Sequence, residues 1–370
     1  MKLNLLLIII LSVVVACRNG QQVIPHEETQ VTEPDTLRHS FYLLNEGNTG
    51  MNQASLDYFS HNTGIYKRNI YNDVNPATVK ELGDVGNDLQ IYGGKLYAVI
   101  NLSNKVEVME KFTAKRIGQI DIPNGRYITF YKGKAYVSSY AAASGTVEGY
   151  VAEIDTTSLE ITRKVTVGRQ PEEMAIINDK LYVANSGGYS PPQFDRTVSV
   201  VDLNTFTEIK RIDVAINLDH MKADKYGDLY VTSRGDYYNI PSKLFVIDSK
   251  TEQIKDSFNL ATSNICMKGD SAYIYSVEWS YITNKNTVTY AIINVKDETV
   301  ITNSFITDGT EKQIQVPYGL AIDPVTADIY VTDAKNYILP GTLYCFSQQG
   351  KKKWSVTTGN IPAHFVFVQP

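Results

Sequence analysis

One short pattern recurs along the chain and restricts what it can fold into: a tyrosine with an apolar residue on each side. On the expected second strands it occurs at seven positions, namely Tyr42, Tyr97, Tyr136, Tyr182, Tyr230, Tyr273 and Tyr330. The gaps run from 39 to 57 residues, close to the repeat of about 40–50 residues that is typical of β-propeller blades. After a loop of variable length, each tyrosine is followed by another apolar strand, at residues 54–59, 105–110, 150–155, 198–202, 244–248, 290–295 and 342–347. Seven such pairs predict an all-β fold, a seven-bladed β-propeller.

The stretch 167–202, with the strand that follows it, shows how one blade is expected to form. Strands are expected at residues 173–177, 181–185, 198–202 and 208–214, separated by polar turns or loops. Short strands joined in this way form a four-stranded antiparallel blade. The repeats begin with a second-strand pattern at residues 41–44 and end with an unpaired first strand at residues 363–368. We therefore expect the C-terminal strand to complete the first blade, which removes an open sheet edge.

The N-terminal segment predicts export and lipid attachment. Residues 5–16 are mostly apolar, and this run is too short to span about 30 Å of hydrocarbon but suits a secretory signal. The sequence Val-Val-Ala-Cys at residues 14–17 resembles the lipobox of bacterial lipoproteins, in which the signal is cleaved before an acylated cysteine. We expect a signal peptide at residues 1–16, a lipidated Cys17 and flexible tether over residues 17–39, and the propeller at residues 40–370. An ordinary signal peptide with an incidental cysteine is the alternative.

Composition limits the partners. The formal net charge is −5, and the main basic cluster is the lysine triplet at residues 351–353 in an expected turn. A nucleic-acid backbone requires a basic binding surface, so we expect no nucleic acid, and membrane contact only through the lipid anchor. Cys266 and Cys345 have apolar flanks in strands of neighbouring blades. We expect two buried thiols; a disulfide, which needs Cα atoms within about 7 Å, is the alternative.

The connections between strands differ in length. First and second strands are joined by short turns such as residues 92–95 and 178–180, whereas second and third strands are joined by long loops, at residues 45–53, 139–149, 185–197, 233–243, 278–289 and 333–341. Alternating strand direction places the long loops, with the connections between blades, at one end of the propeller. We call this end the elaborated face and the opposite end the plain face. The elaborated face is the expected binding surface.

The elaborated face contains the candidate ligand-binding residues. They are aromatic rings and hydrogen-bonding side chains, namely Asn45, Asn101, Arg126, Tyr140, Arg169, Asn185, Tyr189, Phe194, Arg234, Tyr237, Tyr238, Trp279, Tyr281, Tyr318 and Tyr337. Tyrosine offers a large contact area with few rotamers to immobilise, and a hydroxyl that can orient a ligand. Such a surface suits a broad, flat ligand with a polar edge. The alternative is that the loop aromatics pack within their own loops.

Catalytic signals are weak. The sequence has no G-x-S-x-G elbow, no H-E-x-x-H, no phosphate-binding loop and no calcium-loop spacing. Of the five histidines, only His220 and His364 are expected near the elaborated face, and no third metal ligand can be named for either. Carboxylates are also expected near its rim, at Glu46, Glu172, Glu173, Asp219 and Asp333. We expect no metal, no cofactor and no enzymatic activity.

One segment carries a resemblance to a known repeat. KLYVANS at residues 180–186, with VGRQP at residues 167–171 before it and TVSVVD at residues 197–202 after it, resembles the YVTN-type β-propeller repeat. In that repeat a Gly-x-x-Pro segment precedes a Leu-Tyr-Val-x-Asn strand and a Val-x-Val-Ile-Asp strand. DLYVTS at residues 228–233 and DIYVTD at residues 328–333 keep the strand, whereas residues 217–220 depart from the proline segment. The resemblance implies the propeller fold.

A narrower resemblance covers most of residues 40–370. YLLNEGN (42–48), QASLDYF (53–59), YGLAIDPVTADIYVTDAK (318–335) and GNIPAHFV (359–366) are similar to seven-bladed surface lipoproteins of gut Bacteroidales. That group includes proteins that capture cobalamin (vitamin B12) and pass it to an outer-membrane TonB-dependent transporter. The resemblance implies a non-enzymatic protein, lipid-anchored in the outer membrane at the cell surface, with cobalamin or a related corrinoid as cargo.

Other functions remain open at this point. A glycan-binding propeller, a propeller lactonase or lyase, and a structural or docking protein are the alternatives. An enzyme should gather histidines and carboxylates with shifted pKa values at the central channel, whereas a capture protein should present an open aromatic floor.

Overall fold

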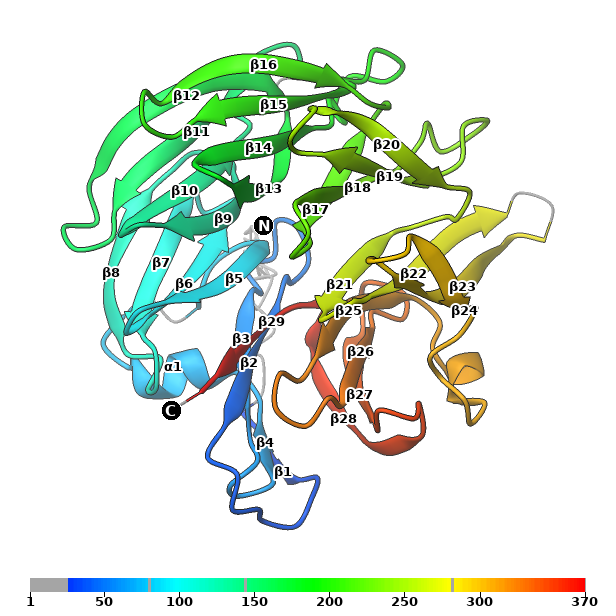
Figure 1. Ribbon diagram of the computed structural model, residues 1–370. Helices are drawn as coiled ribbons and strands as arrows, with labels where there is room; N and C mark the ends of the chain where they lie inside the picture. Colours follow the sequence, from blue (N-terminus) through cyan, green and yellow to red (C-terminus); the bar gives the residue numbers. More distant parts are fainter. Residues whose placement is uncertain (1–25, 79–80, 143–144, 281–282, 370) are drawn as a thin grey trace, which may run out of the picture.

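The protein is a seven-bladed β-propeller (Figure 1). The computed structural model describes residues 26–78, 81–142, 145–280 and 283–369. Six of its sheets have four strands and one has five, and all strand pairs are antiparallel. The predicted fold class is confirmed. The expected signal peptide and Cys17 lie outside the described residues.

The strands follow the predicted order in each blade. From the axis outward, blade 1 contains β29 (Pro362–Val368), β2 (Ser40–Asn45), β3 (Ser55–Ser60), β4 (Ile65–Lys67) and β1 (Glu28–Gln30). Blade 2 contains β5 (Gly86–Tyr92), β6 (Lys95–Ile100), β7 (Lys105–Glu110) and β8 (Arg116–Asp121). Blade 3 contains β9 (Gly125–Tyr131), β10 (Lys134–Ser139), β11 (Glu148–Asp155) and β12 (Ile161–Arg169). Blade 4 contains β13 (Pro171–Ile177), β14 (Lys180–Asn185), β15 (Thr197–Asp202) and β16 (Thr207–Asp213).

The remaining three blades have the same meander. Blade 5 contains β17 (Leu218–Ala223), β18 (Asp228–Ser233), β19 (Lys243–Asp248) and β20 (Gln253–Phe258). Blade 6 contains β21 (Asn264–Lys268), β22 (Ser271–Ser280), β23 (Lys285–Asn294) and β24 (Thr299–Thr302). Blade 7 contains β25 (Pro317–Ile322), β26 (Ile329–Asp333), β27 (Pro340–Phe346) and β28 (Lys352–Asn360). Helix α1 (Ile70–Val74) and the 3-10 helix η1 (Thr310–Gln313) lie in connections.

The hydrophobic core is divided into seven clusters, each between two neighbouring blades. The seven repeated tyrosines lie on the second strands, and each contributes to a different cluster. Three of their hydroxyls reach a neighbouring blade. Tyr182 donates to the carbonyl of Ser249 (3.3 Å), Tyr230 donates to that of Val295 (3.2 Å), and the Tyr330 hydroxyl lies 3.5 Å from His61 Nε2. The repeat therefore marks the contact that packs one blade on the next.

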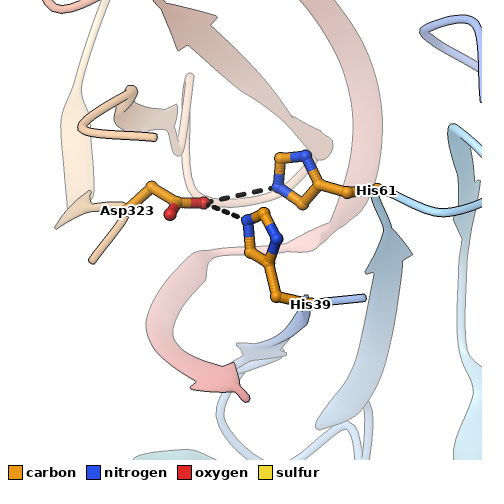
Figure 2. A group of neighbouring side chains, drawn as sticks. All are labelled: His39, His61 and Asp323. Atoms are coloured by element: carbon orange, nitrogen blue, oxygen red, sulfur yellow. Dashed lines mark hydrogen bonds and ion pairs between the residues drawn. The ribbon is translucent and has the colours of Figure 1, made fainter. Parts of the chain in front are cut away.

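The ring is closed by the C-terminal strand, as predicted. β29 pairs with β2, with Ser40 opposite Val368 and Tyr42 opposite Val366, and Figure 1 shows the red β29 beside the blue β2. On the plain face, the same junction brings His39 and His61 of blade 1 beside Asp323 of blade 7 (Figure 2).

The segment before the propeller is more ordered than the sequence indicated. Residues 17–39 were expected to form a tether without regular structure, but β1 adds a fifth strand to blade 1, with Glu28 opposite Lys67. The Lys67 ammonium lies 2.6 Å from the Glu28 carboxylate. Because β1 is only three exposed residues long, no hydrophobic period could reveal it.

Two further predictions concern single features. Cys266 in β21 and Cys345 in β27 are free thiols, Cys345 buried and Cys266 half-buried, so no disulfide joins them. Among the described residues, none of the helices has the length and apolar character needed to cross a bilayer.

Candidate ligand-binding site

A cleft opens on the elaborated face above the central axis. Its outer part, about 680 Å³, lies between blade 5 and blade 6 and is lined by the loop at residues 237–242 and by Trp279. Its inner part, about 420 Å³, extends across the first strands to Glu46 and His364 of blade 1. Asp219, Arg234 and Tyr237 line both parts. We call the two parts together the central cleft.

Exposed aromatic rings form the rim of the outer part. Tyr237, Tyr238 and Trp279 are 59%, 78% and 52% exposed. The carboxylate of Asp236 accepts hydrogen bonds from three backbone amides, at residues 238, 239 and 240, within 2.7–2.9 Å. This turn fixes the loop backbone without using the two tyrosine rings. Both tyrosine rings remain more than half exposed at the rim.

A second aromatic pair lines the inner part from blade 7. Tyr318 and Tyr337 meet edge to face, with ring centroids 6.0 Å apart. The Tyr318 hydroxyl donates to Glu46 (3.0 Å), which also lies 3.3 Å from His364 Nε2. Aromatic surface is thus present on both sides of the inner part.

β-Bulges at the start of the first strands position the residues of the floor. In six blades the register between first and second strands slips near this end. A bulge leaves residues unpaired and redirects their side chains. Here the extra residues are Asn87, Arg126, Tyr127, Glu172, Glu173, Asp219, His220, Tyr318, Gly319 and Ala363. Most of them line the inner part of the cleft.

Hydroxyl groups on the second strands satisfy the backbone at three of these bulges. Thr232 Oγ1 accepts the amide of His220 (2.9 Å), and Ser138 Oγ accepts that of Tyr127 (3.1 Å). Thr332 Oγ1 does the same for Gly319 (2.6 Å). The bulges are therefore stabilised parts of the blade.

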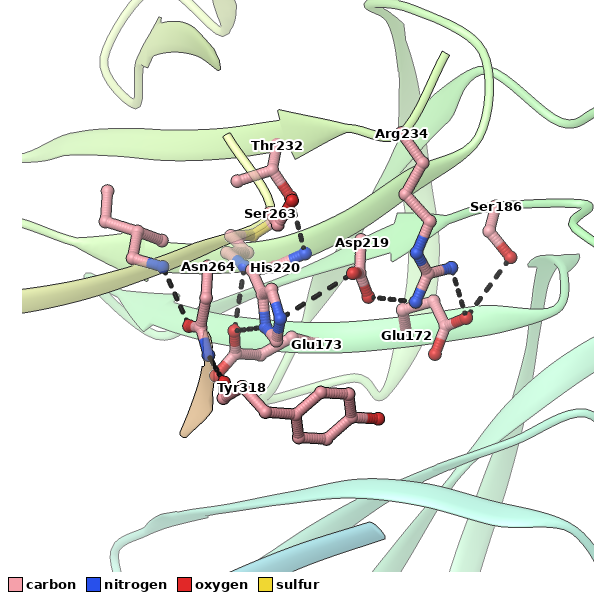
Figure 3. Close-up of polar contacts among 12 residues, drawn as sticks. Glu172, Glu173, Ser186, Asp219, His220, Thr232, Arg234, Ser263, Asn264 and Tyr318 are labelled. Atoms are coloured by element: carbon pink, nitrogen blue, oxygen red, sulfur yellow. Dashed lines mark hydrogen bonds and ion pairs between the residues drawn. The ribbon is translucent and has the colours of Figure 1, made fainter. Parts of the chain in front are cut away.

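Glu172 lies at the centre of one charged network (Figure 3). Its carboxylate is 2.9 Å from Arg126 Nε and 3.2 Å from Arg234 Nη1, and it also accepts the Tyr140 hydroxyl. Arg234 continues to Asp219, 2.7 Å away. Burial alone would raise the pKa of Glu172, but the two guanidinium groups outweigh burial and hold the pKa below its ordinary value. The network fixes two arginines at the cleft floor.

Glu173 organises a second network beneath the first. It lies 3.1 Å from His220 Nδ1 and forms an ion pair with Lys222. Burial opposes ionisation, yet Lys222 and His220 lower the pKa of Glu173 to about 2. Burial likewise disfavours a charged His220, but Asp219 and Glu173 outweigh it and raise the pKa of that imidazole. The floor therefore holds paired, fixed charges.

Family comparison supplies the wider context. A domain of unknown function, DUF5074, matches residues 39–368. The chain belongs to the DUF5074 family. No functionally curated protein matches the sequence.

Solved structures similar to this DUF5074 protein share its fold at low identity. A quinonprotein alcohol dehydrogenase-like protein from Bacteroides thetaiotaomicron has a TM-score of 0.59 and 13% identity, over 88% of this chain and 77% of that one. Apo AztD from Citrobacter koseri has a TM-score of 0.56 and 12% identity, over 90% and 98% of the two chains. Hydrazine synthase from Kuenenia stuttgartiensis has a TM-score of 0.56 and 14% identity, over 70% and 76%. These likenesses establish the propeller alone.

Seven of the fifteen predicted site residues of this DUF5074 chain line the central cleft. Its inner part is lined by Arg126, Arg234, Tyr237, Trp279, Tyr318 and Tyr337, and its outer part also by Tyr238. Tyr140 supports the floor from below through Glu172. Tyr189 and Phe194 lie in the loop between β14 and β15, outside the cleft lining, and Tyr189 packs on Tyr140. Arg169, at the end of β12, donates to the Gln193 carbonyl of this loop (2.7 Å). Tyr281 lies outside the described residues.

The three predicted asparagines have structural roles in the DUF5074 fold. Asn45 and Asn185 are 0% exposed and donate to Ser55 and Ser199 of the adjacent strand. Asn101 is buried and donates to the Gly125 carbonyl (2.9 Å). The structure therefore places these asparagines at the ends of the second strands, buried within the blades and outside the lining of the central cleft.

Several cleft residues were not among the predicted site. The inner part is also lined by Asn87, Tyr127, Ser263, Asn264 and Tyr275. The sequence predicted Asp219, His220, Glu172 and Glu173 near the elaborated face but did not include them among the ligand-binding residues. The sequence feature that could have indicated them is a polar residue at the start of an otherwise apolar first strand. Sequence alone did not show which of these residues would be turned toward the axis by a bulge.

Proposed function

We propose that this protein is a non-enzymatic binding protein that captures cobalamin or a related corrinoid on its elaborated face. The observation that carries the proposal is the central cleft, with outward aromatic rings at its rim and hydrogen-bonded polar groups at its floor. A corrin is a wide, flat ring with amide arms. Aromatic faces suit the ring, and arginine, asparagine and carboxylate groups suit the amides.

Rigidity supports a binding role. The rim loop is fixed by Asp236, and the floor residues lie on bulged strands of a closed ring. A preformed site loses little conformational freedom on binding, which favours affinity. The floor contacts lie on strands, which hold ligand-binding side chains more precisely than loops do.

The charges of the floor also favour binding over catalysis. Glu172 is paired with Arg126 and Arg234, and Glu173 with Lys222 and His220. These contacts lower the pKa of both carboxyls. A general acid works best with a pKa near the operating pH, so neither glutamate is tuned for proton donation.

We further propose that Cys17 anchors the protein in the outer membrane and that a TonB-dependent transporter receives the ligand. The lipobox resemblance supports the anchor, and the Bacteroidales resemblance supports the partner. Labelling with radioactive palmitate should mark the wild-type chain and not a Cys17→Ser variant. Equal labelling of both would contradict the anchor.

The test of the ligand is calorimetric titration of the full chain with cyanocobalamin. We expect one-to-one binding, and Trp279→Ala should weaken it by about tenfold or more, equivalent to about 1.4 kcal/mol. The matched control is Phe112→Ala, which removes an aromatic ring that is 55% exposed on the plain face, between β7 and β8. Binding by the control should equal that of wild type.

Absence of both heat and a thermal shift at micromolar protein would contradict the corrinoid proposal. The same rings could stack on sugar faces, so an oligosaccharide panel is the next set of ligands. Equal binding of cyanocobalamin by wild type and Trp279→Ala would place the ligand outside the central cleft.

His220 supports one alternative, a lactonase or lyase. It lines the inner part and contacts Glu173 and Asp219, and its pKa is raised from the ordinary value. Turnover of a lactone by wild type, abolished in a folded His220→Gln variant, would favour the enzyme over the binding protein.

A further inference from the structure

Three metal-ligating side chains meet on the plain face, at the junction of the first and last blades. His39 precedes β2, His61 follows β3, and Asp323 follows β25. His39 Nε2 lies 3.0 Å from Asp323 Oδ2, and His61 Nε2 lies 3.3 Å from the same oxygen (Figure 2). All three residues are buried or nearly so. None of them takes part in the central cleft.

The spacing of these atoms suits a small tetrahedral cation. One ligand atom from each residue lies within 4.8 Å of the other two. Ligand atoms held about 2.0–2.1 Å from a tetrahedral Zn²⁺ are about 3.3 Å from one another. Two imidazole nitrogens and one carboxylate oxygen form a ligand set common to zinc proteins.

The surrounding contacts hold the ligands in this orientation. The other oxygen of Asp323 accepts the amides of Val325 (2.7 Å) and Thr326 (2.9 Å), which leaves Oδ2 directed at the histidines. The two imidazoles stack with centroids 3.8 Å apart, and Phe59 packs edge-on against His61 at 4.7 Å. The two amide contacts of Asp323 are outer contacts of the kind that fix ligand geometry in metal sites. The Tyr330 hydroxyl lies 3.5 Å from His61 Nε2, and a cation bound to that nitrogen would displace this contact.

A route for a cation and a water ligand is also present. His61 lines a cavity of about 320 Å³, together with residues 32–35, Asp328, Lys353 and Trp354. Three protein ligands leave the fourth position of a tetrahedral cation open, and the cavity can supply a water molecule to fill it.

We propose that His39, His61 and Asp323 form a structural site for a divalent cation of the zinc type. The site joins residues 284 positions apart in the chain, and it does so beside the strand pair that closes the ring. A cation bound there restrains the ends of a long loop, and cation binding is coupled to folding. The site stabilises the contact between the first and last blades, and it is independent of the ligand proposed for the central cleft.

The test begins with the full chain stripped by a chelator and then titrated with Zn²⁺. We expect one Zn²⁺ per chain, retained through gel filtration, and a rise of about 4 °C in the midpoint of thermal unfolding at saturating metal. His61→Gln and Asp323→Asn should lose both effects. The control is His26→Gln, which removes a surface histidine that contacts Asp73 instead of the cluster, and which should keep both effects.

Substitution of Co²⁺ in the wild-type chain provides a measurement that does not depend on the variants folding. Four-coordinate cobalt gives intense visible absorption, and displacement by Zn²⁺ should remove it. No bound metal in wild type, or metal binding that persists in folded His61→Gln and Asp323→Asn, would overturn the proposal. The three residues would then be a hydrogen-bonded triad in which both imidazoles donate to Asp323.

Discussion

At the scale of single residues, the cleft floor is defined by which charges are paired. Glu172 and Glu173 are neighbours in one bulge, yet they have different partners: Glu172 contacts two arginines, and Glu173 contacts His220 and Lys222. Asp219 joins the two sets of contacts, because it pairs with both Arg234 and His220. Each carboxylate is buried with its counter-charge, so loss of one partner leaves the other charge uncompensated. The pairing makes the floor rigid and sensitive to protonation.

The pairing of Glu173 predicts acid sensitivity. Its pKa is lowered from 4.5 to about 2, so the carboxylate stabilises the fold fully above pH 4.5 and this stabilisation is lost as the pH falls toward 2. For a shift of this size the loss is about 3 kcal/mol. Urea unfolding of Glu173→Gln should show a lower free energy at pH 7 and a flatter decline between pH 4.5 and 2.

The control for this experiment is Glu160→Gln, at an exposed position, which should follow the wild-type pH profile. A Glu173→Gln profile parallel to wild type across the acid range would show that Glu173 does not hold a lowered pKa.

At the scale of elements, the bulge near the start of six of the seven first strands is the feature that creates the site. It places two consecutive side chains near the axis where a regular strand would place one. The hydroxyl opposite the bulge, such as that of Thr232, accepts the hydrogen bond of a backbone amide that has no partner in the strand ladder. Because several blades have such a bulge, their polar side chains together surround the axis at the floor of the cleft.

This construction predicts a specific cost for Thr232→Val. The substitution keeps the side-chain shape but leaves the buried amide of His220 without its acceptor, so we expect a loss of about 1–3 kcal/mol in the free energy of unfolding and weaker ligand binding. Denaturant unfolding and titration of the same sample measure both. Thr207→Val, on the exposed start of β16, is the control. Unchanged stability in Thr232→Val would show that the hydroxyl does not support the bulge.

Packing between elements also explains why the Gly-x-x-Pro segments begin with glycine. A Cβ atom on Gly168 would lie 2.4 Å from Asn185 Cγ, and one on Gly359 would lie 2.6 Å from Asn45 Cγ. Glycine is required because the last asparagine of the second strand occupies that space. The glycine of the repeat motif is therefore explained by packing between a connection and the asparagine at the end of a second strand.

At the scale of the whole molecule, stability depends on closure. β29 pairs with β2 and packs between the first strands β25 and β5, and its Phe365 and Phe367 contribute to the core between blades 7 and 1. An open ring would expose this core and the edge of β2, which is an aggregation hazard.

Deletion of residues 362–370 tests the closure. We expect loss of the cooperative thermal transition and of the monomer peak in gel filtration. Deletion of residues 26–30 removes only β1, whose residues are exposed, and should leave both nearly unchanged. A monomeric 362–370 deletion with wild-type melting would show that β29 is not needed to close the ring.

The sequence by itself determined the number of blades, their strand order, the closing strand and the difference between the two faces. These follow from local patterns, because strand alternation, turn residues and a tyrosine that must be buried act within one repeat and recur seven times. Only the tertiary structure decided which polar residues meet. The bulges, the pairing of Glu172 with Arg126 and Arg234, and the meeting of His39 with Asp323 all depend on contacts between blades. Such contacts join residues far apart in the chain, and no local pattern in the sequence records them.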